Sequence, residues 1–188
     1  MAEDAAAPGP AEKPESAAAE KTGRNPRNDY FGIHIVQSNY AVKFADSSKR
    51  NYRASGIGFI VGRAPPRGFG FEIEWGGARI YEKGVGLNAS YADNYNIMVR
   101  GKYSYEIAGF FRPYAGVGIG PSLWITDGGK WNFSYQGFAG ISLNLTSYFD
   151  ADFRLAIQNL GRMPDDHVFK TAGNVIETAT RVGVLWKY

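Results

Sequence analysis

The chain has 188 residues, a formal net charge of +3, 24 glycines, 15% aromatic residues and no cysteine. This length suits one domain with room for a barrel of about eight strands, and the lack of cysteine excludes a disulfide scaffold and a thiolate metal site. The small net charge, without a basic motif interleaved with aromatic residues, gives no reason to expect nucleic acid as a partner. No run reaches the roughly 18 to 20 apolar residues of a transmembrane helix, but a membrane barrel is not excluded, because its inward residues are polar.

Residues 1–29 differ from the rest of the chain. The segment from Ala2 to Thr22 consists mainly of Ala, Pro, Glu, Lys and Gly and has no aromatic residue, so we predict that it is disordered. The acidic start leads to no apolar stretch of a signal peptide. Either Met1 replaces a signal peptide that has been removed or the protein is cytoplasmic, and the strand pattern that follows favours the first. The expected domains are this tail, placed in the periplasm, and a barrel over 30–188.

From residue 30 onward, short runs of alternating apolar and polar residues are separated by turn residues. Most runs have about the ten residues that a tilted strand needs to cross a membrane. We predict an all-β fold with eight antiparallel strands near 30–44, 55–63, 69–81, 93–106, 112–125, 132–145, 149–160 and 175–188. The connectors alternate between short ones and longer ones, at 45–54, 82–92, 126–131 and 161–174. Short periplasmic turns and longer outer loops are typical of an up-and-down transmembrane barrel, whose even strand number places both chain ends in the periplasm.

The fourth run illustrates the two faces of a predicted strand. Its odd-numbered residues from Tyr95 to Tyr105 are apolar, aromatic or glycine, and its even-numbered residues from Asn96 to Glu106 are mostly polar. The first run is less regular and is expected to change register at a bulge near Asn39. Several aromatic residues lie near the predicted strand ends, as in the girdles of membrane barrels: Trp75, Tyr103, Tyr105, Trp124, Phe149, Trp186 and Tyr188. A soluble lipocalin-type barrel shares the alternation but not the girdles, so the pattern favours an outer face toward lipid.

Charged residues recur on the polar faces of the predicted strands. The acids are Glu72, Glu74, Glu106, Asp150 and Asp152, and the bases are Arg100, Lys102, Arg154, Arg181 and Lys187. An eight-stranded barrel has an interior only wide enough for side chains, and an unpaired buried charge costs several kcal/mol. The equal numbers of acids and bases therefore predict a paired interior network in a plugged, non-conducting barrel. The alternative is a soluble barrel that carries these charges on its solvated surface.

The last strand ends on aromatic residues. Val182, Val184, Trp186 and Tyr188 share one face, which suits contact with lipid and an end at the membrane interface. Trp186 and Tyr188 are expected to form the C-terminal signal that the barrel assembly machinery reads.

Two glycine-containing segments point to a family. The segment 111–120, which reads FRPYAGVGIG, and the segment 140–146, which reads GISLNLT, resemble strands of small Gram-negative outer-membrane barrels, namely the OmpA transmembrane domain and the opacity-type surface proteins. The resemblance covers about residues 29–188 and implies the outer membrane as location. We expect Gly116, Gly118 and Gly120 to face inward and leave space for long charged side chains. They are not a phosphate-binding loop, because no helical period follows Gly120.

Catalysis has little support in the sequence. His34 is expected to be a satisfied interior residue, and His167 lies in a predicted loop after Asp165 and Asp166. That loop triplet is a weak candidate for a cation site, because three adjacent residues do not readily point at one ion. No serine-hydrolase elbow accompanies either histidine. We therefore expect no enzymatic activity, no cofactor and no metal.

Binding is better supported at the two ends of the barrel. Lys49, Arg50 and Arg53 in the predicted first loop can meet the phosphates of lipopolysaccharide or form a solvated rim, and related proteins act on host surface molecules as adhesins. Some related barrels are joined to peptidoglycan through an N-terminal Ala followed by an acidic residue, which Ala2 and Glu3 match. The expected function is a structural outer-membrane barrel that supports envelope integrity. The alternatives are an adhesin or lipopolysaccharide-binding surface protein, and a small channel or carrier for apolar solutes.

Overall fold

The computed structural model describes residues 28–44, 49–82, 90–126, 129–162 and 172–188. It contains eight strands, which are β1 (Asp29–Phe44), β2 (Lys49–Arg63), β3 (Arg67–Glu82), β4 (Ser90–Tyr105), β5 (Phe111–Ile125), β6 (Gly129–Asn144), β7 (Phe149–Arg162) and β8 (Ala172–Lys187). Within the described ranges there is no helix of the length and apolarity that a membrane crossing requires.

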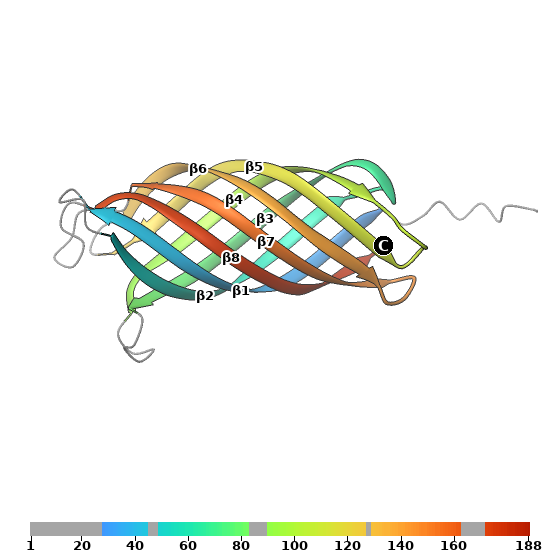
Figure 1. Cartoon of the computed structure of the whole chain (residues 1–188), viewed down its shortest axis with the longest axis horizontal. Helices are drawn as coiled ribbons and strands as arrows, with labels where there is room; N and C mark the ends of the chain where they lie inside the picture. The colour runs from blue at the N-terminus through green and yellow to red at the C-terminus, as the bar shows by residue number, and fades with distance from the viewer. Residues whose placement is uncertain (1–27, 45–48, 83–89, 127–128, 163–171) are drawn as a thin grey trace, which may run out of the picture.

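The strands form one closed barrel in which each strand pairs antiparallel with its neighbour in sequence (Figure 1). Strand β8 closes the barrel by pairing with β1, over a ladder that begins at Tyr30 and Lys187. The strands are tilted against the barrel axis, as closure requires (Figure 1). These features confirm the predicted fold, an eight-stranded antiparallel up-and-down barrel.

The barrel has two ends that differ in what they connect. Asp29 and Tyr188 meet at one end, where the Tyr188 backbone N–H donates to the Asp29 carbonyl at 3.1 Å. We call this the terminal end, and it also carries the turns at 64–66, 106–110 and 145–148. We call the opposite end the loop end. The segments that connect the strands there are 45–48, 83–89, 126–128 and 163–171.

Most strands extend further than the sequence pattern predicts, and the largest difference is at the loop end. Strand β2 begins at Lys49 rather than near 55, so most of the predicted first loop is strand. Its ladder with β1 continues to the pair of Lys43 and Lys49, which provides hydrogen bonds for the backbone of these polar residues. The barrel wall therefore continues beyond the apolar stretches that reveal it in the sequence.

The predicted register change near Asn39 is wrong. Inward and outward residues alternate without interruption from Tyr30 to Lys43, and β1 shifts register only between Val42 and Phe44, against β8. The first run looks irregular because the inward residues beyond Asn39 are apolar, while the outward ones become polar. Apolar residues therefore change from the outward face to the inward face, while the alternation of the backbone continues unchanged.

This exchange divides the barrel into two sections. In the charged section, from the terminal end to the middle, buried inward residues include Glu72, Arg100 and Arg154, and outward residues are apolar, such as Phe69 at 84% exposure. In the crown, at the loop end, most buried inward residues are apolar, and nine of them form one cluster: Tyr40, Val42, Tyr52, Ala54, Ile80, Ala92, Trp124, Leu160 and Val175. The outer face of the crown is mainly polar over β8, β1, β2 and β3, and it stays apolar on β5 and β6.

Candidate functional site

Glu72 is the centre of the ion-pair network inside the charged section. It is fully buried on β3 and pairs with Arg154 of β7, whose Nη2 lies 3.2 Å from Oε2. Lys102 of β4 places Nζ 3.0 Å from the same oxygen. Because β3 and β7 are opposite strands of the closed barrel, the pair of Glu72 and Arg154 spans the interior.

Glu74, one inward position further along β3, extends the network to β8 and to a second cation of β4. Arg181 of β8 places Nη1 3.2 Å from Glu74 Oε1, and Arg100 of β4 contacts Oε2 through Nη1. Arg154 Nη1 lies 3.7 Å from Oε2. The two glutamates of β3 therefore share cations from β4, β7 and β8, so each glutamate has more than one partner.

Hydroxyl and imidazole groups complete the partners of the carboxylates. Tyr30 Oη donates to Glu72 Oε2 at 2.6 Å. Tyr114 Oη lies 2.8 Å from both oxygens of Asp152 and accepts a hydrogen bond from Arg154 Nε at 3.1 Å. His34 Nε2 lies 2.9 Å from Asp152 Oδ2, and His34 is fully buried. The tyrosines and the histidine thus belong to the same interior network as the charges.

Inward glycines make room for these long side chains. A Cβ on Gly118 would lie 2.7 Å from Cγ of Arg100, as the sequence predicts for that glycine. At Gly116 a Cβ would meet the backbone of β4 and the Phe138 ring, and at Gly120 it would meet the backbone of β4 alone. Only one of the three predicted glycines therefore accommodates a charged side chain.

A separate group of ion pairs lies at the terminal end. Lys187 Nζ is 2.7 Å from Asp150 Oδ1, and both side chains are buried. Glu106, predicted inside the barrel, lies just beyond β4 and is half-buried, with Arg112 Nη2 2.9 Å from its Oε2. Glu106 is placed there because β4 ends at Tyr105, so the inward alternation no longer applies to it.

The crown closes the interior above the charges. Trp124 is fully buried, packs edge-to-face on Tyr40 with ring centroids 6.1 Å apart, and donates from Nε1 to the Leu160 carbonyl at 3.3 Å. The prediction that Trp124 belongs to an outer girdle is wrong, because it has the inward parity of β5. Nor does Trp75 lie near a strand end: it is an outward residue in the middle of β3.

The interior of the barrel is occupied by these charged and apolar side chains. A barrel of this size is just wide enough for side chains to fill, and buried ion pairs are stable only with good geometry and further hydrogen bonds. The charged section has ion pairs and hydrogen bonds across four strands, and an apolar layer follows it at the loop end. Nε and Nη2 of Arg100 and Nε of Arg181 are buried without a hydrogen-bond partner among the described residues. The ion pairs connect strands on opposite sides of the barrel.

Several predicted site residues do not join this network. Lys49, Arg50 and Arg53 are exposed, but they lie on β2 and not in a loop. Trp186 and Tyr188 are outward and exposed, with the Trp186 ring 5.8 Å from that of Phe149, and their role as an assembly signal stays a prediction. Ala2 and the loop triplet that includes His167 lie outside the described residues. Among the described residues, no group of three or more His, Asp or Glu side chains is placed to hold a metal ion.

One interior carboxylate was missed by the sequence analysis. Glu177 of β8 is buried and accepts a hydrogen bond from Ser38 Oγ at 2.5 Å. Its parity is that of Arg181, four residues later on the same strand, so the alternation alone could have found it. With Glu177 counted in place of Glu106, buried acids and bases still balance.

Comparison with known proteins shows similarity in fold. No family model and no curated protein matches the chain. Among solved structures, Neisserial surface protein A matches with a TM-score of 0.61 at 13% identity, covering 84% of this chain and 97% of that one. The outer-membrane protein AlkL matches at 0.51 and 14%, covering 100% and 97%. Ail of Yersinia pestis, in complex with the heparin analogue sucrose octasulfate, matches at 0.50 and 15%, covering 86% and 99%. The chain therefore has the transmembrane fold of the small eight-stranded outer-membrane β-barrels.

Proposed function

We propose that this protein is a non-enzymatic structural barrel of the outer membrane, which supports envelope integrity and ties the membrane to peptidoglycan through its N-terminal tail. The observation that carries the proposal is the filled interior. Ion pairs from Glu72 and Glu74 brace β3 against β4, β7 and β8, and the crown closes the loop end. These are the properties of a rigid anchor.

The place where the chain enters the barrel supports the tether. Strand β1 starts at Asp29 at the terminal end, and short turns such as those at this end are typical of the periplasmic side. Residues 1–27 lie outside the described part of the chain. Extended, such a segment reaches about 90 Å, and as a relaxed flexible chain it reaches roughly 30 Å. We propose that Ala2, followed by Glu3, is the residue joined to peptidoglycan once Met1 is absent.

Mass spectrometry of muramidase-digested sacculi tests the tether, with cells that make the untagged protein. We expect tail peptides that start at Ala2 and carry a muropeptide. Deletion of residues 2–4 should abolish these peptides, whereas deletion of the three alanines at 17–19 should leave them in place. A free Ala2 amine, recovered only in the outer-membrane fraction, would contradict the tether and leave the structural barrel as the proposal.

A second candidate function, binding of polyanions at the loop end, is favoured by the exposed cations of the crown. Lys43 of β1 is directly opposite Lys49 of β2, and Arg50 and Arg53 follow on the same wall. Guanidinium and ammonium groups bind phosphate and sulfate by charge-assisted hydrogen bonds. The solved complex of Ail with sucrose octasulfate supports this chemistry for a barrel of the same fold, with lipopolysaccharide or a sulfated host glycan as the partner.

Titration with sucrose octasulfate separates this function from the structural one. Lys49→Gln combined with Arg53→Gln should weaken binding, and Arg67→Gln, which removes an exposed cation at the terminal end, should not. Equal binding by both variants would count against the loop-end site.

The third candidate, a channel or carrier for apolar solutes, makes the opposite prediction in a planar bilayer. We expect no steady ion conductance from the folded protein, because the crown and the ion pairs fill the interior. Stable single-channel steps from the wild-type protein would replace the structural proposal with a porin-like one.

A further inference from the structure

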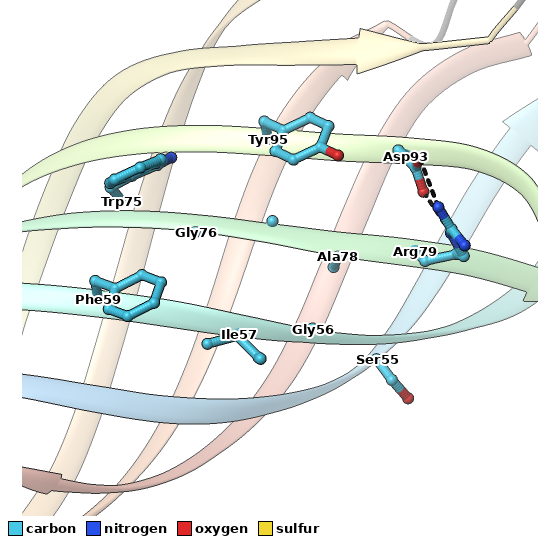
Figure 2. Close-up of a pocket in the computed structure, with 11 residues that line it drawn as sticks. Ser55, Gly56, Ile57, Phe59, Trp75, Gly76, Ala78, Arg79, Asp93 and Tyr95 are labelled. Atoms are coloured by element: carbon cyan, nitrogen blue, oxygen red, sulfur yellow. Dashed lines mark hydrogen bonds and ion pairs between the residues drawn. The ribbon is translucent and has the colours of Figure 1, made fainter.

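A groove of about 440 Å³ lies on the outer wall of the barrel, across β2, β3 and β4. Figure 2 shows Phe59 and Trp75 toward one end of it and the ion pair of Arg79 and Asp93 at the other. It faces away from the interior network and shares none of its residues.

The groove exists because one outward position has no side chain. The register places Gly77 of β3 between Ile57 of β2 and Tyr95 of β4. A Cβ on Gly77 would lie 2.8 Å from two carbon atoms of the Tyr95 ring, so the ring packs closely against one side of the glycine. The floor of the groove is therefore backbone, and its walls are the side chains on either side.

The two ends of the groove have different chemistry. Phe59 and Trp75 are exposed at 40% and 61%, with ring centroids 6.0 Å apart, and they form an apolar end. At the other end, Arg79 donates to Asp93 from Nε at 2.9 Å and from Nη2 at 3.3 Å. Arg79 is 64% exposed and Asp93 only 26%, so the pair presents its cation to the surroundings.

The position of the groove along the barrel determines how an occupant is oriented relative to the membrane. Along β2 the outward residues are apolar from Ile57 to Val61 and polar from Asn51 to Ser55. The groove spans this boundary, with its charged end toward the loop end. In a membrane barrel the boundary is the interface of the outer leaflet, so an occupant has its apolar part in the membrane and its anionic part at the surface.

We propose that this groove binds one molecule of the phosphorylated glycolipid of the outer leaflet, lipid A. One acyl chain lies over Gly77 against Phe59 and Trp75, and a phosphate accepts hydrogen bonds from Arg79, whose Nη1 is not used by Asp93. Arginine is suited to this role because its planar fork matches phosphate oxygens. The proposal rests on the outer-membrane location and is independent of the tether.

Native mass spectrometry of the folded protein in detergent, titrated with hexa-acyl bis-phosphorylated lipid A, tests the charged end. Arg79→Gln should weaken retention about tenfold, through the loss of charge-assisted hydrogen bonds. Arg63→Gln is the matched control, because Arg63 makes a similar exposed pair with Asp29, at 2.8 Å and 3.0 Å, at the terminal end. The control should bind like the wild type.

The apolar end is tested by filling the groove. Gly77→Leu should displace the acyl chain and reduce lipid A retention at least as much as Arg79→Gln does. Gly137→Leu is its control, since Gly137 is also outward and a Cβ there meets nothing within 4 Å. The shift in gel mobility on heating shows which variants are folded, and Arg79→Gln keeps the test valid if Gly77→Leu does not fold.

Equal retention by Arg79→Gln and Arg63→Gln would overturn the proposal, as would equal retention of lipid A stripped of its phosphates. Retention of phosphatidylethanolamine as strongly as lipid A would show a general annular lipid and would also overturn it. In each of these cases, a folded barrel whose tail is still found on sacculi would leave the proposed function intact.

Discussion

The charged section and the crown have the same backbone and opposite chemistry. In the charged section, Arg100 and Arg154 are inside and Phe69 and Ile73 are outside. In the crown, Trp124 and Ile80 are inside and, on β1 and β2, Asn39 and other polar residues are outside. A strand fixes only that successive side chains alternate, and the surroundings decide which face is apolar.

The difference between the two outer faces shows where the surroundings of the wall change from lipid to water. Apolar residues face outward where lipid surrounds the wall, and inward where water surrounds it, because apolar surface is stabilised away from water in both cases. On β1 this change occurs between Ile35, 63% exposed, and Gln37, the next outward residue. Over β1 and β2 the crown is therefore built like the wall of a small soluble barrel, and continuous strands join it to the lipid-facing wall.

Removing Glu72 should break the charged section most severely. Glu72→Ala leaves Arg154 and Lys102 buried without their main carboxylate, and loss of one partner from a buried pair costs about 3–5 kcal/mol. Urea unfolding of protein folded into lipid vesicles, followed by tryptophan emission, measures the loss. An unfolding free energy unchanged from the wild type would show that water enters the section and solvates these cations.

An added charge on the outer wall should destabilise the charged section more than the crown. Ile73→Arg places a cation on the lipid side of β3, which costs about 2–4 kcal/mol near the middle of a bilayer. Asn39→Arg places the same side chain on the polar wall of the crown and should change little. The same unfolding measurement checks both, and an equal loss from the two variants would contradict the placement of the boundary.

Truncating an apolar side chain should distinguish the packed interior of the crown from the lipid-facing wall. Ile80→Ala opens a cavity at a fully buried position and should cost about 2–3 kcal/mol. Ile73→Ala removes the same atoms where lipid can fill the gap, so it lacks the cavity contribution and should cost less. The comparison fails if the ranking of the two variants is reversed.

The smallest effect is expected at the exposed ion pair of the terminal end. Asp29→Asn removes the negative charge and one of the two hydrogen bonds to Arg63, and exposed pairs of this kind contribute no more than about 1 kcal/mol. This loss should also diminish with added salt. A loss as large as that of Glu72→Ala would show that Arg63 is less accessible to solvent than its 60% exposure indicates.

Much of the barrel follows from the sequence by alternation alone. All eight strands are present, and every predicted inward charge except Glu106 is buried: Glu72, Glu74, Arg100, Lys102, Asp150, Asp152, Arg154, Arg181 and Lys187. The two errors of facing have one cause. Trp124 and the wrongly predicted bulge at Asn39 both lie in the crown, where apolar residues face inward. A rule that assigns every apolar residue to the outer face therefore fails there.

The sequence determined the strands, their parity and the set of charges that had to be paired, because these depend on residues close together in the chain. Tertiary structure decided which charge meets which, since Glu72 and Arg154 are brought together only by closure of the barrel. It also decided the groove, because Ile57, Gly77 and Tyr95 are aligned by the registers of separate ladders. A strand carries its own alternation, but register and closure are properties of all eight strands together.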